Sequence, residues 1–222
     1  MQREHDHTLQ QPALAALSPD VTQCPAQAWL WLSRAVHDRH MGFHTPTLIT
    51  LANGGEPDGR VVVLRKADQA RSLFMAHTDV RSDKARMIQT RSAHASANTC
   101  AWVFYDARLR LQIRARGTLS LHTNDALADA QWLASTLHSR RCYLAPHAPG
   151  SEQAEIDHNL PIEVRDRAPT LEESHAGRVN FGVLVSRVHS FDMLHLGSKG
   201  HSRCVWEVSD AGEPVRMRWL AP

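Results

Sequence analysis

Two short runs of β-branched residues, separated by a tight-turn sequence, constrain the fold of this chain more than any other feature. The runs are TLITLAN at 47–53 and RVVVLRKA at 60–67, and GGEPDG lies between the end of one and the start of the other. β-Branched side chains favour extended backbone, whereas Gly-Gly and Pro-Asp-Gly favour a reversal of the chain. The sequence therefore predicts an antiparallel hairpin over these residues.

Further apolar runs, some of them alternating with polar residues, predict more strands of similar length. These runs are at 72–78, 100–106, 109–121, 180–194, 201–208 and 215–220. Helices are expected at 25–39, 82–91 and 125–137, and the hydroxyl of Ser82 is placed to cap the second of them. Several short strands at this spacing are typical of a barrel, with the first helix at one of its ends.

Length and charge exclude several classes of protein. The 222 residues are enough for one sizeable domain, expected at 24–222, after a polar tail at 1–23. The 25 basic and 23 acidic residues leave a net charge of +2, so neither nucleic acid nor a membrane surface is expected as a partner. The first residues lack the apolar core of a secretory signal, and no stretch approaches the roughly 20 apolar residues of a membrane span.

The cysteines and histidines do not form a pattern of metal ligands. The 4 cysteines contain no Cys-x-x-Cys pair, which argues against a zinc knuckle and fits reduced thiols in a cytoplasm. Among the 15 histidines, even the close pair His5 and His7 has no recurring ligand spacing, so no metal site is predicted. No serine elbow of the GxSxG type is present either.

The stretch from Arg60 to Lys84 has the donors of an anion-binding site. Arg60, Arg65 and Lys84 supply cationic groups, and Thr78 and Ser82 supply hydroxyls. A phosphate monoester is held by several charge-assisted hydrogen bonds from such groups. The stretch therefore predicts a phosphorylated cofactor.

Three motifs occur here in the order and approximate spacing of one known family. RVVVLR, HTDVRSDK and LRLQIRARG together resemble the pyridoxamine 5'-phosphate oxidase-like, FMN-binding split-barrel family. The resemblance runs from about residue 45 to 117 and returns weakly in KGHSRCVWE and in the closing MRWLAP. It implies a six-stranded antiparallel split β-barrel with flanking helices, and a homodimer with FMN between its subunits.

The resemblance also assigns site residues. The strand from Val61 to Leu64 would pass the flavin ring with its backbone, and Gln112 would reach the flavin across the two-fold interface. The full set of cofactor-binding residues implied is Arg60, Val61, Val62, Val63, Leu64, Arg65, His77, Thr78, Ser82, Lys84, Gln112 and Arg203. No side chain is assigned as a catalytic residue, because the flavin carries the electron chemistry.

The substrate-facing positions depart from the family pattern. Arg140, Lys199 and His201 match substrate-binding positions, but Lys199 replaces a fork-shaped arginine by a point charge. Thr136 and Leu144 stand where the family's phosphate clamp has a tyrosine and a serine. Asp83 replaces a basic residue of the cofactor site, which therefore has one positive charge fewer.

Two classes of function follow from the sequence. The first is an FMN-dependent oxidoreductase that passes electrons between FMN and a small substrate, either a pyridoxine or pyridoxamine phosphate or a reduced nicotinamide. The second is a non-catalytic split-barrel protein that binds flavin, or that binds haem through His195 or His201. A haem protein would leave the predicted phosphate site without a role.

Overall fold

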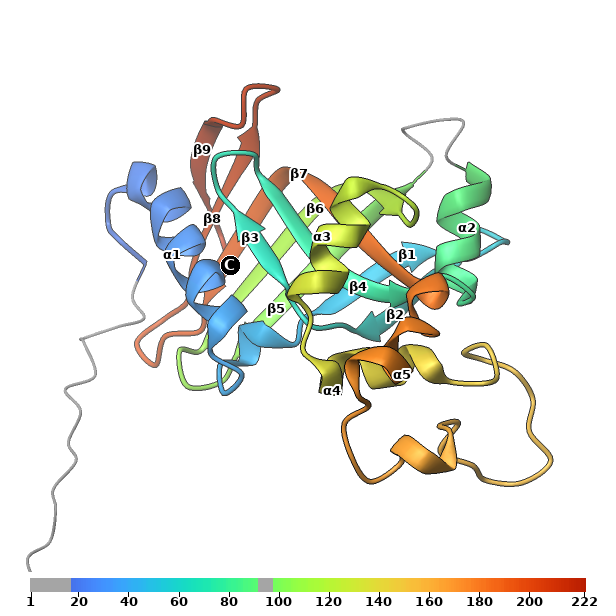
Figure 1. Ribbon diagram of the computed structural model, residues 1–222. Coiled ribbons are helices and arrows are strands. Elements are labelled where there is room, and N and C mark those ends of the chain that lie inside the picture. The colour runs from blue at the N-terminus through green and yellow to red at the C-terminus, as the bar shows by residue number, and fades with distance from the viewer. Residues whose placement is uncertain (1–16, 92–97) are drawn as a thin grey trace, which may run out of the picture.

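The computed structural model describes residues 17–91 and 98–222, and within them nine strands form one sheet (Figure 1). The strands are β1 (Thr47–Leu51), β2 (Pro57–Val61), β3 (Lys66–Asp68), β4 (Leu73–Asp79), β5 (Thr99–Asp106), β6 (Leu111–His122), β7 (Phe181–His195), β8 (Ser202–Val208) and β9 (Pro214–Leu220). Their order is β2-β1-β5-β6-β7-β4-β3, with β8 and β9 continuing from β7, and the paired strands are antiparallel. The predicted mainly β, antiparallel class is confirmed; the described sheet has nine strands, and the resemblance implied a barrel of six.

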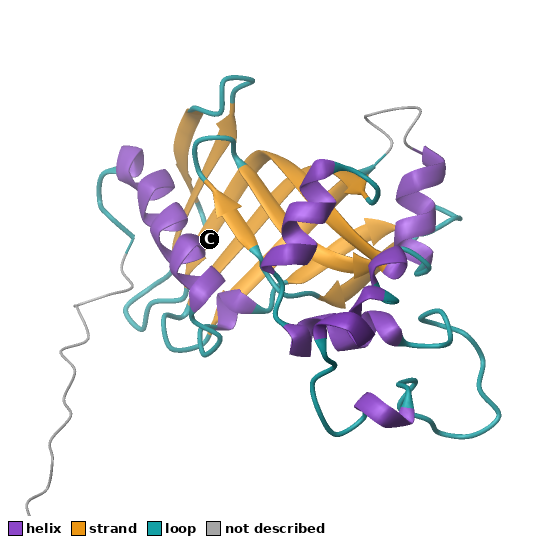
Figure 2. Ribbon diagram, viewed as in Figure 1, coloured by secondary structure: helices purple, strands orange, loops and turns teal. Residues whose placement is uncertain are grey.

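The helices lie around the sheet (Figure 2). They are α1 (Cys24–His37), α2 (Asp83–Arg91), α3 (Ala126–Ala134), α4 (Leu137–Arg140) and α5 (Leu171–His175). Figure 1 shows α1 and α2 at opposite ends of the sheet and α3 across one of its faces. None of the helices in the described ranges is both long and apolar enough to cross a bilayer.

The helix predicted at 125–137 is two helices. α3 ends at Ala134, and Thr136 is extended, with ψ 151°. Its hydroxyl accepts a hydrogen bond from the backbone N–H of Ser139, which starts α4. A threonine favours this capping role over a position inside a helix, so the break follows from local side-chain chemistry.

The run at 60–67 is also not the single strand that was predicted, because β2 ends at Val61 and β3 begins at Lys66. The N–H groups of Val62 and Leu64 each donate over 2.9 Å to carbonyls just before β1, whereas the N–H of Arg65 donates over 2.8 Å to a carbonyl of β4. Since β2 and β3 lie at the two ends of the main strand order, this link joins both edges of the sheet and closes a barrel. Strand propensity alone does not reveal such a change of partner.

Aromatic rings fill the barrel and fix α1 against it. Phe74 of β4 is fully buried and contacts Trp29 of α1, Trp102 and Phe104 of β5, and Phe191 of β7, with ring centroids 5.3 to 6.1 Å apart. Each such pair contributes about 0.5–1.5 kcal/mol beyond its buried area. The predicted placement of the first helix against the barrel therefore agrees with the packing of Trp29.

The packed structure extends to residues N-terminal of α1. Leu17 is 7% exposed and belongs to the same apolar core. Asp20 caps a short 3₁₀ helix at Val21–Gln23 by accepting from the N–H of Thr22 over 3.0 Å. Residues 1–16 of the predicted tail lie outside the described residues.

A smaller apolar cluster fixes α3 against β4 and β7. Trp132 of α3 and Tyr143, in a 3₁₀ helix at Arg141–Leu144, both contact Phe181, with ring centroids 5.2 and 5.0 Å apart. Phe181 opens β7 and lies opposite Asp79, the last residue of β4. This cluster brings the segment after α3 close to the end of β4, where the predicted site begins.

β7 has 15 residues and pairs with different strands along its length. Its first residues pair with the end of β4, whereas Leu194 near its other end lies opposite both Gln112 of β6 and Arg203 of β8. At about 3.3 Å per residue, the two ends of β7 are on the order of 40 Å apart along the strand. The strand therefore separates the two groups of predicted site residues.

Candidate cofactor-binding site

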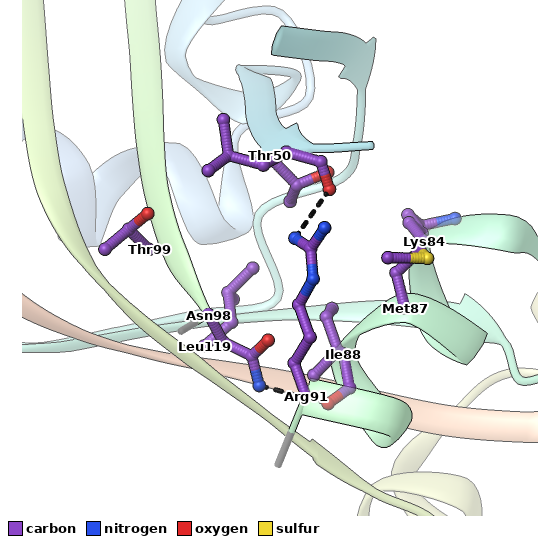
Figure 3. A pocket seen from close by; sticks show the side chains of 9 residues that line it. Thr50, Lys84, Met87, Ile88, Arg91, Asn98, Thr99 and Leu119 are labelled. Atoms are coloured by element: carbon purple, nitrogen blue, oxygen red, sulfur yellow. Dashed lines mark hydrogen bonds between the residues drawn. The ribbon is translucent and has the colours of Figure 1, made fainter. Parts of the chain in front are cut away.

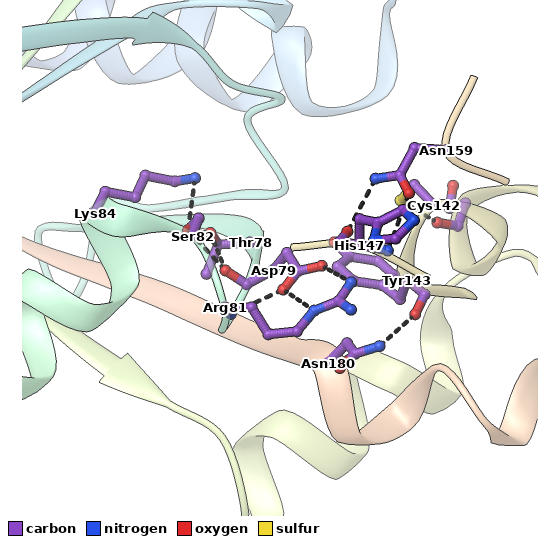
Figure 4. Close-up of polar contacts among 11 residues, drawn as sticks. Thr78, Asp79, Arg81, Ser82, Lys84, Cys142, Tyr143, His147, Asn159 and Asn180 are labelled. Atoms are coloured by element: carbon purple, nitrogen blue, oxygen red, sulfur yellow. Dashed lines mark hydrogen bonds and ion pairs between the residues drawn. The ribbon is translucent and has the colours of Figure 1, made fainter. Parts of the chain in front are cut away.

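The end of β4, the turn after it and the first turn of α2 bring three predicted polar residues together (Figure 4). Thr78 Oγ1 lies 3.4 Å from Ser82 Oγ, and Lys84 Nζ donates to Ser82 Oγ over 3.3 Å. Thr78 and Ser82 are only 3% and 5% exposed, so burial holds both hydroxyls in place. α2 begins at Asp83, so Ser82 directly precedes the helix as predicted. The sequence predicted that its hydroxyl accepts from a backbone N–H, whereas the hydroxyl donates to the Asp79 carbonyl over 2.7 Å.

Arg60 contributes a second cation from β2. Its guanidinium donates to Thr50 Oγ1 over 2.8 Å and forms an ion pair with Asp58. The pKa of Lys84 lies below its ordinary value, first because the ammonium is buried and second because the positive charge of Arg60 is near; Asp79 and Asp58 offset part of this effect. Two neighbouring cations, one of them desolvated, favour binding of an anion. The donor set therefore fits a phosphate group.

A small pocket lies beside these cations and is lined by Thr50, Lys84, Met87, Arg91 and Asn98 among others (Figure 3). Arg91 donates over 3.2 and 2.7 Å to two carbonyls at and just after the end of β1. It ties the last turn of α2 to the sheet and brings a third positive charge to this side of the molecule. The motifs did not indicate Arg91, because its role depends on β1 lying next to α2.

The strand predicted to pass the flavin ring is the link that closes the barrel. Val62 and Leu64 are buried, at 9% and 0% exposure, and their N–H groups are used inside the barrel. Val61 is 67% exposed, and Val63 is half-buried. Because neighbouring residues of an extended chain face opposite sides, the backbone groups directed away from the barrel are those of Val61 and Val63.

His77 and Arg65 lie on the side of the site that faces α3. The ring nitrogen Nε2 of His77 lies 3.2 Å from Gln131 Oε1, and the ring packs edge-on against Phe181 at 4.8 Å. Burial lowers the pKa of His77 to about 4, with a further lowering from the charge of Arg65, while the hydrogen bond with Gln131 acts in the opposite direction. His77 is therefore neutral at pH 7. Within the described part of the chain, the buried Nε of Arg65 has no hydrogen-bond partner.

Arg81 neutralises a carboxylate whose charge reaches the site. Its Nε and Nη2 donate to the two oxygens of Asp79 over 3.0 and 2.7 Å, as Figure 4 shows. The negative charge of Asp79 acts on Lys84 and would otherwise weaken the attraction for an anion. The motif HTDVRSDK contains Arg81, but its sequence position alone did not distinguish it from a solvent-exposed arginine.

The remaining residues that the resemblance assigned lie at the far end of β7. Gln112 and Arg203 are partly buried there, and Lys199 and His201 are exposed between β7 and β8. Arg203 donates from Nε and Nη2 to the carboxylate of Asp192 over 3.0 and 2.8 Å, and Arg114 pairs with the same carboxylate. One chain therefore brings together Arg60, Thr78, Ser82 and Lys84, and holds this second group apart from them.

Arg140 belongs to neither group: it lies in α4 and packs against α3. It is 4% exposed, and its guanidinium lies 4.8 Å from the ring centroid of Trp132. It donates to the carbonyls of Trp132 and Leu133 over 3.1 and 3.2 Å and to Ser174 Oγ over 3.3 Å. These contacts join α3, α4 and α5. The suggested substrate contact of Arg140 stays a prediction, and in this arrangement its guanidinium is committed to the protein.

Comparison with known proteins finds a family model that covers Arg60, Thr78, Ser82 and Lys84. Residues 26–123 match the family model described as the pyridoxamine 5'-phosphate oxidase, FMN-binding domain. A pyridoxine/pyridoxamine 5'-phosphate oxidase of Thermosynechococcus vestitus is 32% identical over 125 residues, which are 56% of this chain and 55% of that enzyme. The chain thus spans about half the length of that curated relative.

Solved structures share the fold over almost the whole chain. A pyridoxamine 5'-phosphate oxidase-related, FMN-binding protein from Nostoc punctiforme matches 93% of this chain and 99% of its own, with a TM-score of 0.63 at 22% identity. PhzG from Burkholderia lata, solved with tetrahydrophenazine-1-carboxylic acid, matches 95% of this chain and 100% of its own, with a TM-score of 0.65 at 16% identity. At these identities the two structures establish the fold.

Proposed function

Because residues 26–123 of this chain match the model of the pyridoxamine 5'-phosphate oxidase, FMN-binding domain, we propose that the protein is an FMN-dependent oxidoreductase. The family and its cofactor are those that the sequence motifs predicted. One observation supports particular residues: Lys84 contacts the buried hydroxyl of Ser82, which lies beside that of Thr78, and Arg60 is close enough to lower the pKa of Lys84, after the larger effect of desolvation. Such a cluster supplies the donors that the phosphate of FMN requires.

When bound, FMN supplies reversible hydride and electron transfer, and the protein's residues bind and orient the reactants. In the proposed site, Arg60 and Lys84 hold the phosphate by charge, and the hydroxyls of Thr78 and Ser82 fix its position. His77 is neutral at pH 7, so it can donate or accept a hydrogen bond without adding charge beside a substrate. Arg65 adds a positive charge on the same side of the site.

The active form in this proposal is a homodimer. Gln112 and Arg203 lie at the end of β7 that is far from Lys84, on the order of 40 Å along the strand. A second copy related by a two-fold axis can bring its Gln112 and Arg203 to the Lys84 end of the first, and the same contact is then made twice. A complete site in this arrangement needs both chains.

The contacts of Arg140 indicate which kind of electron donor to test first. Three of its N–H groups donate to protein oxygens, and only 4% of the residue is exposed. Lys199, the other cationic residue that the resemblance assigned to the substrate, offers a point charge in place of an arginine fork. Both observations favour an electron donor that does not depend on a phosphate clamp at Arg140, and a reduced nicotinamide is the first to test.

The test begins with an absorption spectrum of the protein mixed with FMN and then desalted. We expect a retained two-band flavin spectrum, followed by oxidation of a reduced nicotinamide in air that depends on bound FMN. Pyridoxine 5'-phosphate is assayed beside it and is expected to be the poorer donor. A haem Soret band without flavin retention would replace the proposal by the haem-binding alternative, and retained flavin without turnover of either donor would leave a flavin-binding protein that is not this oxidoreductase.

A further inference from the structure

A chain of hydrogen bonds joins three residues where β6 meets α3: Ser120, His122 and Asp125. None of the three belongs to the proposed flavin site. Ser120 Oγ lies 3.2 Å from His122 Nε2, and His122 Nδ1 lies 2.7 Å from Asp125 Oδ2. Both distances are within the range found between a nucleophile, its general base and the group that orients the base. No sequence motif indicated these three residues, because they lie on a strand and at a helix cap and not on a GxSxG elbow.

Asp125 is fixed in place by a second interaction. Its Oδ1 accepts a hydrogen bond from the backbone N–H of Ala128 over 2.9 Å, so the residue caps α3 while its Oδ2 faces the imidazole. The hydrogen bond from Ala128 is the main reason that the pKa of Asp125 lies below its ordinary value, and the contact with His122 lowers it further. The carboxylate is therefore ionised at neutral pH, and it requires a proton on Nδ1 of His122.

This tautomer determines whether the hydroxyl of Ser120 can donate a hydrogen bond to His122. With the proton on Nδ1, the Nε2 of neutral His122 is an acceptor, and the hydroxyl of Ser120 can donate to it. The carbonyl of Val185 is a second possible acceptor for that hydroxyl, but at the longer distance of 3.4 Å. The serine is therefore placed to lose its proton to the imidazole, which is the arrangement of a Ser-His-Asp relay.

Ser120 also borders a hollow large enough for a small molecule. Its volume is about 320 Å³, and its wall includes Leu119, Leu121 and Val185 as well as Arg187. The aliphatic side chains suit an apolar acyl group, and Arg187, whose guanidinium donates to the carbonyl of Asp210, adds a cationic residue to the lining. A small carboxylic ester matches this combination better than a large or strongly cationic substrate.

From this geometry we propose that Ser120, His122 and Asp125 form an acyl-transfer site that hydrolyses small carboxylic esters. Ser120 Oγ forms a bond to the acyl carbon while its proton passes to His122 Nε2, and the bond from the acyl carbon to the alcohol oxygen breaks as that proton goes to the leaving alcohol. Water then attacks the acyl-serine, with His122 again accepting and returning the proton. The products are a carboxylic acid and an alcohol, and no oxidant or metal is required.

The experiment uses p-nitrophenyl acetate as the probe, with release of nitrophenolate followed by absorbance and the acetylated residue located by peptide mass mapping. We expect acetylation of Ser120 in the full-length protein and its loss in Ser120→Ala. His122→Gln should slow acetylation of Ser120 about 100-fold, within the usual contribution of general base catalysis. Asp125→Asn should slow it too while still capping α3, because asparagine is an equally good N-cap.

Thr118→Ala is the matched control, since Thr118 lies on the same face of β6 and borders the same hollow without belonging to this chain of hydrogen bonds. It should acetylate at the rate of the unmodified protein. Melting temperature and flavin retention are measured for every variant, so that a loss of folding or of the flavin site is separated from a loss of acylation. Absence of an adduct on Ser120 in the folded protein, or an equal rate in His122→Gln, would overturn the proposal.

Discussion

Lys84 Nζ donates a hydrogen bond over 3.3 Å to Ser82 Oγ, at the first turn of α2 and within reach of the positive charge of Arg60. The two cations repel one another, and burial of the ammonium adds to the cost of keeping Lys84 charged. The negative charge of a bound phosphate would offset both effects. Binding of the cofactor and the charge state of Lys84 are therefore coupled.

Replacing Lys84 by alanine should weaken FMN binding by about 1.5–3 kcal/mol, the usual range for a hydrogen bond to a charged group. The dissociation constant, measured by quenching of flavin fluorescence on titration, gives this value directly. Arg86→Ala is the matched control, because Arg86 is an exposed cation of the same helix paired only with Asp83 in the described contacts. An equal loss of affinity in both variants would point to the general charge of α2 instead of a specific site.

Mixing two inactive variants should restore flavin binding if each site is built from two chains. Lys84→Ala removes the phosphate end of a site, and Gln112→Ala removes the contribution of the partner chain. In dimers re-formed at random from equal amounts, about one quarter of the sites would contain both native residues, as follows from two-fold symmetry. Flavin retained after unfolding, mixing and refolding is the readout, and no recovery beyond the separate variants would argue against a shared site.

Replacing Arg140 by alanine should lower the free energy of unfolding on the order of 3 kcal/mol. The change removes three hydrogen bonds and the contact with Trp132, and a buried polar group left without a partner costs about 1–3 kcal/mol. Chemical denaturation measures the loss, with His138→Ala on the exposed side of α4 as the control. A stable Arg140→Ala variant that loses activity only toward pyridoxine 5'-phosphate would instead assign Arg140 to a substrate.

Stability should fall as the pH drops from about 6.5 to about 4, in part because of His77. Burial holds the folded-state pKa at about 4, below the ordinary value of 6.5, so the unfolded chain takes up a proton in this window that the folded protein does not. The stabilisation is complete above the unfolded pKa and is lost as the pH falls through the folded pKa. Denaturation curves at several pH values measure the slope, and His77→Gln should reduce it across this window and leave it unchanged above pH 7.

The class of fold and the grouping of Thr78, Ser82 and Lys84 could be predicted from the sequence, because both depend on short-range patterns. β-Branched runs mark most strands, and HTDVRSDK holds Thr78, Ser82 and Lys84 within seven residues of one another. The split of the run at 60–67 could not be foreseen, because it depends on which strands meet when the sheet closes. The contribution of Arg91 and the pairing of Arg203 with Asp192 depend in the same way on contacts between strands distant in the sequence.

Between Val62 and Arg65 the backbone changes its hydrogen-bond partners from one edge of the sheet to the other. These residues close the barrel: the N–H groups of Val62 and Leu64 donate to carbonyls before β1, and that of Arg65 donates to a carbonyl of β4. The same residues are predicted to run alongside the flavin. If FMN binds along these residues as predicted, it would stabilise the contact between the two edges of the sheet. The barrel without FMN would then open first at this link, and loss of the cofactor would coincide with the start of unfolding.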